Sequence, residues 1–198
     1  MSFTEAWDFL LPVMEALEKV HQNKLIHRDI SPDNFIIKED DSIKLLDFGS
    51  AREYAEEKTM TVLVKKGYAP PEQYSREGKQ GPWTDIYSIC ATLYEMITGV
   101  IPQPAMERVK ADKLYLPSSY GCDITPLQEK ILMKGLALDY KKRYKDITEL
   151  KNSFFPEKQE RQKKNKKYGI LMCTVCILLL TGAILGKQNH DKKEALSE

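Results

Sequence analysis

The stretch HRDISPDN at residues 27–34 is the part of this sequence that decides its fold. Two short apolar runs follow it, FII at 35–37 and IKLL at 43–46, and the polar residues between them predict a β-hairpin. The string DFG at 47–49 comes directly after the second run, and the string APPE at 69–72 follows further along. A single DFG occurs often by chance. All three strings, in this order and around a hairpin, form a specific pattern.

Helices are predicted on both sides of this pattern. A capping box and an apolar stripe at helical spacing predict a first helix over 2–21. Residues 47–83 lack long periodicity and contain several glycines and prolines, which predicts a long loop, and such loops are usually functional. Apolar periodicity then predicts a helix over 84–99 and two shorter ones near 126–138 and 146–154.

Together these strings resemble the signatures of eukaryotic-type (Hanks-type) protein serine/threonine kinases of the bacterial kind. TDIYS at 84–88 looks like the start of the long central kinase helix, and DYKKRY at 139–144 like the late arginine motif. The resemblance covers residues 4–154. It implies a mainly α fold, a kinase-like C-terminal lobe in which a small β-hairpin carries the catalytic and metal-binding loops.

The resemblance also implies a chemistry, the transfer of a phosphoryl group from ATP to a protein hydroxyl with Mg²⁺ as cofactor. Asp29 would accept or orient the proton of the substrate hydroxyl. Asn34 would hold one Mg²⁺ and Asp47 the other, both jointly with ATP, because hard oxygen ligands suit this ion.

Other residues are implied as structural support. His27 would pack in the core, and Gly49 would give flexibility beyond the metal-binding aspartate. Asp85 would hydrogen-bond the backbone of the catalytic loop. Glu72 and Arg143 would form a buried ion pair that ties the long loop to the helices.

Arg28, beside the catalytic aspartate, suggests a phosphate-sensing site. Thr59 and Thr61 in the long loop would then be phosphorylated, which would order that loop. An ordinary solvated loop explains these two hydroxyls equally well.

Two positions depart from the family pattern. These kinases usually carry a lysine two residues after the catalytic aspartate and a threonine shortly before the G-Y-x-A-P-E run, and here Ser31 and Lys65 stand at these places. The two side chains face each other in the family, so the pair is interpreted as exchanged, with Lys65 neutralising the transferring phosphate. A second interpretation treats Lys65 and Lys66 as solvated loop charges, and the sequence favours neither.

One family feature has no counterpart. The first glycine is Gly49, so no glycine-rich phosphate loop precedes the catalytic loop, and the 26 residues before His27 predict a single helix. The strand lysine that holds the α- and β-phosphates therefore has no place here. We expect residues 1–156 to form the C-terminal (catalytic) lobe of a kinase with the N-terminal lobe absent.

The charges divide the chain further. The 198 residues carry 30 Lys and Arg against 29 Asp and Glu, and 42% of them are hydrophobic. This near-zero balance gives no reason to expect nucleic acid as a partner, and the apolar content excludes wholesale disorder. Residues 1–156 are slightly acidic, whereas 157–167 hold six basic and two acidic side chains, typical of a basic juxtamembrane linker.

Residues 168–186 carry no charged side chain and would span about 28 Å as a helix, which predicts one transmembrane helix. A buried core helix is the alternative, but the short polar tail 187–198 offers little to cover it. Because more Lys and Arg lie before the segment than after it, a single-pass membrane protein is expected, with the kinase lobe cytoplasmic and the tail outside.

Three interpretations of function stay open. The first is an ATP-dependent protein serine/threonine kinase, weakly active or inactive by itself because the absent lobe normally supplies many nucleotide contacts. The second is a non-catalytic, membrane-anchored docking module, similar to a pseudokinase. The third is one half of a split kinase whose N-terminal lobe is a separate partner. Retention of Asp29, Asn34 and Asp47 favours the first interpretation.

Overall fold

Helix α2 (Pro82–Thr98) lies at the centre of the fold. Twelve of its 17 residues are buried, as expected of a helix that other elements cover on all sides. It begins two residues earlier than predicted because Pro82 suits the first turn and the Thr84 hydroxyl accepts a hydrogen bond from the Gly81 N–H at 3.1 Å. It ends at Gly99, whose φ of +71° glycine adopts readily.

The computed structural model describes residues 1–39, 42–46, 52–53, 64–75 and 77–154. The chain divides into two units, Met1–Phe154 and Phe155–Glu198, and the predicted linker, membrane segment and tail fall in the second, outside the described residues. Among the helices of the described part, none is long and apolar enough to cross a membrane.

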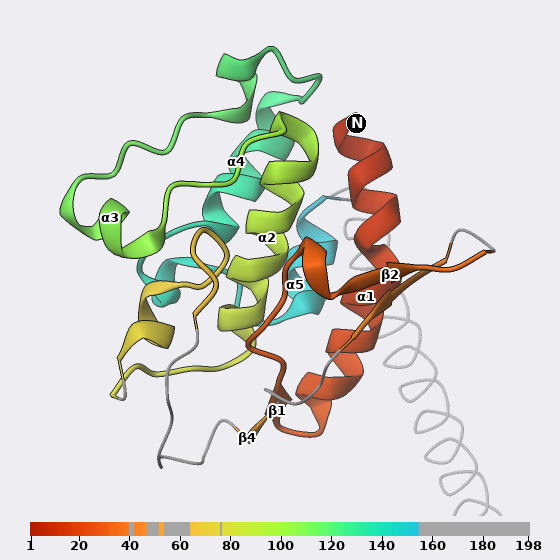
Figure 1. Cartoon of the computed structure of the whole chain (residues 1–198), viewed down its shortest axis with the longest axis vertical. Helices are drawn as coiled ribbons and strands as arrows, with labels where there is room; N and C mark the ends of the chain where they lie inside the picture. The colour runs from red at the N-terminus through yellow and green to blue at the C-terminus, as the bar shows by residue number, and fades with distance from the viewer. Residues whose placement is uncertain (40–41, 47–51, 54–63, 76, 155–198) are drawn as a thin grey trace, which may run out of the picture. The chain divides into compact units, whose positions relative to one another are not determined.

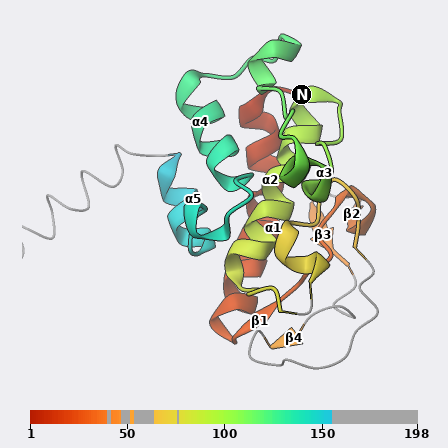
Figure 2. The same cartoon turned by 90° about the vertical axis from the view of Figure 1, so that its left-hand side faces the viewer.

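Helix α1 (Phe3–Gln22) packs along α2, and the predicted first helix is confirmed (Figures 1 and 2). The predicted capping box is present, with Ser2 Oγ accepting from the Glu5 N–H and the Glu5 carboxylate accepting from the Ser2 N–H. The buried stripe includes Leu10, Met14 and Leu17, each fully buried. Each such side chain contributes about 1.5–3 kcal/mol through burial.

Helices α4 (Pro126–Gly135) and α5 (Ile147–Ser153) also pack against α2 and correspond to the two shorter predicted helices. Helix α4 ends three residues before its predicted end. Its last residue, Gly135, lies against Cys90 of α2, where a β-carbon would overlap the cysteine sulfur. The short helix α3 (Ala105–Lys110) was not predicted, because six residues are too few to show a helical period.

The predicted hairpin is confirmed as strands β2 (Phe35–Ile37) and β3 (Ile43–Leu45), which pair antiparallel. The second sheet was missed. It joins β1 (Leu25–Ile26), directly before the catalytic loop, to β4 (Arg52–Glu53) in the region predicted as loop.

Four short 3-10 helices lie in the described part of the chain. Three of them flank the site: η1 (Pro32–Asn34), η3 (Pro71–Tyr74) and η5 (Tyr140–Lys142). Hydrogen bonds join the loop after β1 to the first turn of α2, and the residue after β3 to η1. The residues singled out in the sequence gather there.

Candidate active site

The loop 27–34 is held in place by Asp85, a fully buried carboxylate in the first turn of α2. Asp85 Oδ2 accepts a hydrogen bond from the His27 N–H at 2.8 Å, and Oδ1 accepts from the Arg28 N–H at 2.9 Å. Arg28 has a φ of +72°, a left-handed conformation that costs a non-glycine residue about 1–2 kcal/mol. These two bonds hold the loop in that conformation, and they are the contacts that the resemblance implied for Asp85.

Two histidines lie beneath the loop. His27 is fully buried, its Nδ1 accepts from the Asp29 N–H at 3.4 Å, and its Nε2 lies 3.2 Å from the Leu46 carbonyl oxygen. It therefore packs in the core, as predicted, and also links the catalytic loop to the end of β3. His21 of α1 was not predicted as part of the site, and its Nε2 lies 2.8 Å from Asp85 Oδ2.

Asn34 closes the loop back onto Asp29. Its side-chain Nδ2 donates to the Asp29 carbonyl oxygen at 2.6 Å, and its backbone N–H donates to the Ser31 carbonyl oxygen at 3.0 Å. The Leu46 N–H donates to the Asn34 carbonyl oxygen at 2.8 Å, so the end of β3 lies beside η1. The half-buried Asp29 is thus positioned by backbone contacts on both sides of the loop.

The amide of Asn34 fits the role of a Mg²⁺ ligand. Because its nitrogen is used in the bond to Asp29, its oxygen, the atom that Mg²⁺ prefers, lies on the other side of the amide. Asp47, the second predicted ligand, follows Leu46 in the chain and lies outside the described residues. Within the described ranges there is no cluster of three or more His, Cys, Asp or Glu side chains that could hold a metal ion.

Lys65 and Ser31, the two departures from the family pattern, are in contact. Lys65 Nζ donates to Ser31 Oγ at 2.8 Å and lies 2.6 Å from Asp33 Oδ2. Ser31 is fully buried, whereas about a third of the Lys65 side chain (32%) is exposed. The two residues are therefore face to face across the site, as the exchange hypothesis requires.

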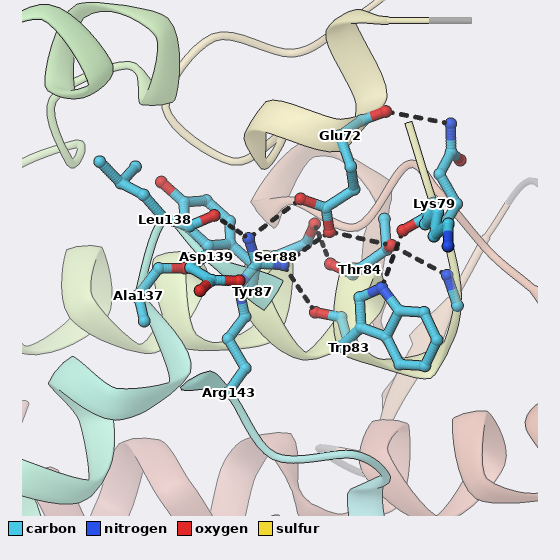
Figure 3. Close-up of polar contacts among 12 residues, drawn as sticks. Glu72, Lys79, Trp83, Thr84, Tyr87, Ser88, Ala137, Leu138, Asp139 and Arg143 are labelled. Carbon is cyan, nitrogen blue, oxygen red and sulfur yellow. Dashed lines mark hydrogen bonds and ion pairs between the residues drawn. The ribbon is translucent and has the colours of Figure 1, made fainter. Parts of the chain in front are cut away.

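The predicted ion pair between Glu72 and Arg143 is present and buried (Figure 3). Arg143 Nη1 lies 2.6 Å from Glu72 Oε1 and Nη2 lies 3.0 Å from Oε2, a two-pronged arrangement. The guanidinium also donates to three backbone carbonyl oxygens, those of Trp83, Ala137 and Leu138. The pair connects η3 to the start of α2 and to the segment before η5.

Residues that the sequence did not single out connect the 64–75 segment to the site. Gln73 Nε2 donates to the Arg28 carbonyl oxygen at 2.7 Å, and the Tyr68 hydroxyl donates to Glu95 Oε2 at 2.5 Å. Burial, together with the Glu95 carboxylate, raises the pKa of the Tyr68 phenol. Nothing in local spacing signals these contacts, since each joins residues more than 25 positions apart.

Four predicted residues lie outside the described part of the chain: Asp47, Gly49, Thr59 and Thr61. The roles assigned to them stay predictions. The hydrogen bonds that the other predicted residues make with α2 lie at its first turn, among them those to Trp83 and Asp85.

Comparison with known proteins decides the family. Residues 1–155 match the family model described as the protein kinase domain. The chain belongs to the protein kinase family. The predicted family and the helical, kinase-like fold are therefore confirmed, while the C-terminal membrane anchor stays a prediction.

Bacterial kinases are among the relatives of this kinase-family chain. Serine/threonine-protein kinase PknB of Mycolicibacterium smegmatis is 31% identical over 158 residues, covering 74% of this chain and 25% of the relative. The probable serine/threonine-protein kinase CA_C1728 of Clostridium acetobutylicum is 31% identical over 160 residues, covering 76% of this chain and 24% of the relative. The chain spans about a quarter of the length of these curated relatives.

A solved structure, "PpkA-294 apo form", superposes on this kinase-family chain with a TM-score of 0.62 and 35% sequence identity. The match covers 73% of this chain and 51% of the solved chain. Most of this chain therefore shares its fold with that solved structure.

Proposed function

We propose that the chain carries the catalytic lobe of an ATP-dependent protein serine/threonine kinase. The observation that carries the proposal is the loop of residues 27–34, which Asp85 holds by two backbone hydrogen bonds and Asn34 closes onto Asp29. Preorganised groups of this kind are what phosphoryl transfer requires, since its catalysis is mostly positioning and charge stabilisation.

In the proposed reaction the Asp29 carboxylate accepts the proton of a serine or threonine hydroxyl on the protein substrate. The hydroxyl oxygen forms a bond to the γ-phosphorus of ATP while the bond from that phosphorus to the β,γ-bridging oxygen breaks, and ADP leaves. Asn34 and Asp47 would hold Mg²⁺, which neutralises charge on the phosphate oxygens when bound. Asp85 takes no part in the transfer itself and keeps the loop that carries Asp29 in its strained conformation.

We expect slow turnover by these 198 residues. Their first glycine is Gly49, so they hold no glycine-rich loop ahead of the catalytic loop to bind the phosphates. Attachment to a membrane through residues 168–186, with the lobe on the cytoplasmic side, stays a prediction that fractionation of expressing cells would test.

The proposal is tested with the full chain, γ-³²P-ATP, Mg²⁺ and casein as a general phosphoacceptor. Asp29→Asn should lower the transfer rate by about 10²- to 10⁴-fold, the range for loss of a general base. Asp123→Asn removes an exposed carboxylate outside the site and should leave the rate unchanged.

Two results would contradict the proposal. Equal rates for the parent chain and Asp29→Asn would show that Asp29 does not participate. Failure of the parent chain to bind ATP with Mg²⁺ in a calorimetric titration would favour a non-catalytic docking module instead.

A further inference from the structure

We propose that Lys65 is the catalytic cation of this site and that Ser31 is the residue that positions it. The inference rests on the proposed kinase function and deepens it. Lys65 would contact the γ-phosphoryl group during transfer, and Ser31 would act only through Lys65. The family places a lysine in the catalytic loop itself, whereas here the ammonium comes from a segment 34 positions further along the chain.

The hydrogen bond between the two side chains is the central observation. Lys65 Nζ lies 2.8 Å from Ser31 Oγ, and Ser31 is fully buried two residues after Asp29. A lysine side chain loses considerable conformational entropy when it is fixed in one rotamer, so a solvated surface lysine seldom makes such a contact. The ammonium is therefore fixed beside the catalytic loop.

The backbone of Lys65 is fixed as well. Its backbone carbonyl oxygen accepts hydrogen bonds from the N–H groups of Tyr68 at 3.1 Å and Ala69 at 3.0 Å. Both of these residues are buried, and the Tyr68 carbonyl oxygen accepts from the Ser88 hydroxyl of α2 at 3.0 Å. The segment that delivers Lys65 is thus attached to the same helix that holds the catalytic loop through Asp85.

The other partner of the ammonium leaves room for a phosphate. Asp33, 2.6 Å from Lys65 Nζ, has a side chain that is 78% exposed, and such exposed ion pairs are weak. Ser31 is neutral and does not compensate the charge of the lysine. An ammonium has three N–H donors, so a phosphate oxygen can take the third donor or replace Asp33. A dianionic phosphate is the stronger competitor for this cation.

Lys66 provides the matched control. It is the adjacent residue, carries the same charge and is exposed. Within the described part of the chain its side chain forms no ion pair and no hydrogen bond. If general positive charge near the site were sufficient, Lys65 and Lys66 would be equivalent. If the contact with Ser31 matters, only Lys65 is required.

The experiment uses the full chain and four variants: Lys65→Met, Lys66→Met, Ser31→Thr and the double variant Ser31→Lys/Lys65→Thr. The first readout is kcat and KM for transfer from ATP to casein. Lys65→Met should lower kcat by about 10²- to 10³-fold with little change in KM for casein, because the contact is made mainly in the transition state. Lys66→Met should stay within about twofold of the parent rate.

The double variant tests the exchange directly. It returns the lysine to the catalytic loop and a hydroxyl to the facing segment, so it should recover most of the activity lost in Lys65→Met. Ser31→Thr retains the hydroxyl that accepts from Lys65 and should lower kcat less than Lys65→Met does. The urea midpoint of each variant, followed by the fluorescence of Trp7 and Trp83, separates loss of catalysis from loss of fold.

The second readout is binding, measured by titration calorimetry with Mg²⁺ and either ADP or the non-hydrolysable analogue AMP-PNP. Lys65→Met should weaken binding of AMP-PNP by about tenfold and leave binding of ADP unchanged, because only AMP-PNP carries the γ-phosphoryl group. A tenfold change in Kd is about the contribution of one charge-assisted hydrogen bond. Equal effects of Lys65→Met and Lys66→Met, in turnover and in binding, would overturn the assignment of Lys65 and leave the kinase function standing. Absence of nucleotide binding by the parent chain would overturn the proposed function, and the inference with it.

Discussion

Replacing Arg143 by methionine should destabilise the folded lobe more than almost any other single change. The Arg143 side chain is fully buried, and its guanidinium makes five hydrogen bonds, the full number of its N–H donors. Methionine retains much of the apolar stem and removes all five bonds. The change leaves the carboxylate of Glu72, whose side chain is 6% exposed, without its cation.

The expected magnitude follows from that loss. Removing one partner of a buried ion pair costs about 3–5 kcal/mol because an uncompensated charge stays buried. The additional loss of the three hydrogen bonds to backbone carbonyl oxygens places the change at the upper end of this range. For a domain of this size about 1 kcal/mol lowers the melting temperature by about 2–4 °C, so a loss of about 5 kcal/mol should lower it by about 10–20 °C.

The assay is urea or thermal unfolding of the full chain, followed by tryptophan fluorescence. Both tryptophans of the chain, Trp7 and Trp83, lie in the unit Met1–Phe154, so the signal reports this unit alone. Lys134→Met is the control, since Lys134 pairs with Glu149 through side chains that are 41% and 38% exposed. Such a pair contributes about 1 kcal/mol or less.

A double-mutant cycle tests the physical cause. Glu72→Gln removes the stranded charge, so Glu72→Gln/Arg143→Met should be less destabilised than the sum of the two single changes. Two outcomes would contradict a large contribution from this ion pair: a shift of the unfolding midpoint by Arg143→Met no larger than that by Lys134→Met, or additivity of the two single changes.

Two further predictions concern stability. Burial raises the pKa of the Cys90 thiol to about 12 and also raises the pKa of the Tyr87 phenol, whereas these groups ionise near 8.5 and 10 in an unfolded chain. Above these values the unfolded state releases protons that the folded state retains, so the urea midpoint should fall as pH rises from about 8.5 to 12. A urea midpoint independent of pH in this window would contradict the prediction. Gly67→Ala should destabilise the folded state by about 2–4 kcal/mol, because Gly67 has a φ of +90° and a β-carbon there would overlap the Ile101 side chain. Adding Ile101→Ala should recover only the part of this loss that comes from the steric overlap. Full recovery of stability would exclude a contribution from backbone strain.

Local features could be predicted from the sequence because their causes lie within a few residues. The capping box at Ser2 and Glu5 and the end of α2 at Gly99 depend on neighbouring backbone groups. The β2–β3 hairpin depends on two apolar runs with a polar turn between them. The catalytic loop was identified by the order of three strings and the family resemblance that they carry.

Elements without a local signal were missed. Helix α3 has only six residues, and the pairing of β1 with β4 involves two residues on each strand. The start of α2 at Pro82 depends on the Thr84 hydroxyl, which accepts from the backbone only once the turn has formed. These elements exist because the surrounding fold places them, and their own propensity is weak.

The sequence by itself determined the family, the chemistry implied for Asp29 and Asn34, and the pairing expected for Glu72 with Arg143. Only the tertiary structure decided that Lys65 contacts Ser31, 34 positions away, and that His21 contacts Asp85, 64 positions away. The reason is physical: a residue type shows what a side chain can do, whereas a hydrogen bond of 2.8 Å depends on how distant segments pack. For Lys65 this packing decides between the two interpretations, a cation held at the loop 27–34 and a solvated surface charge, in favour of the first.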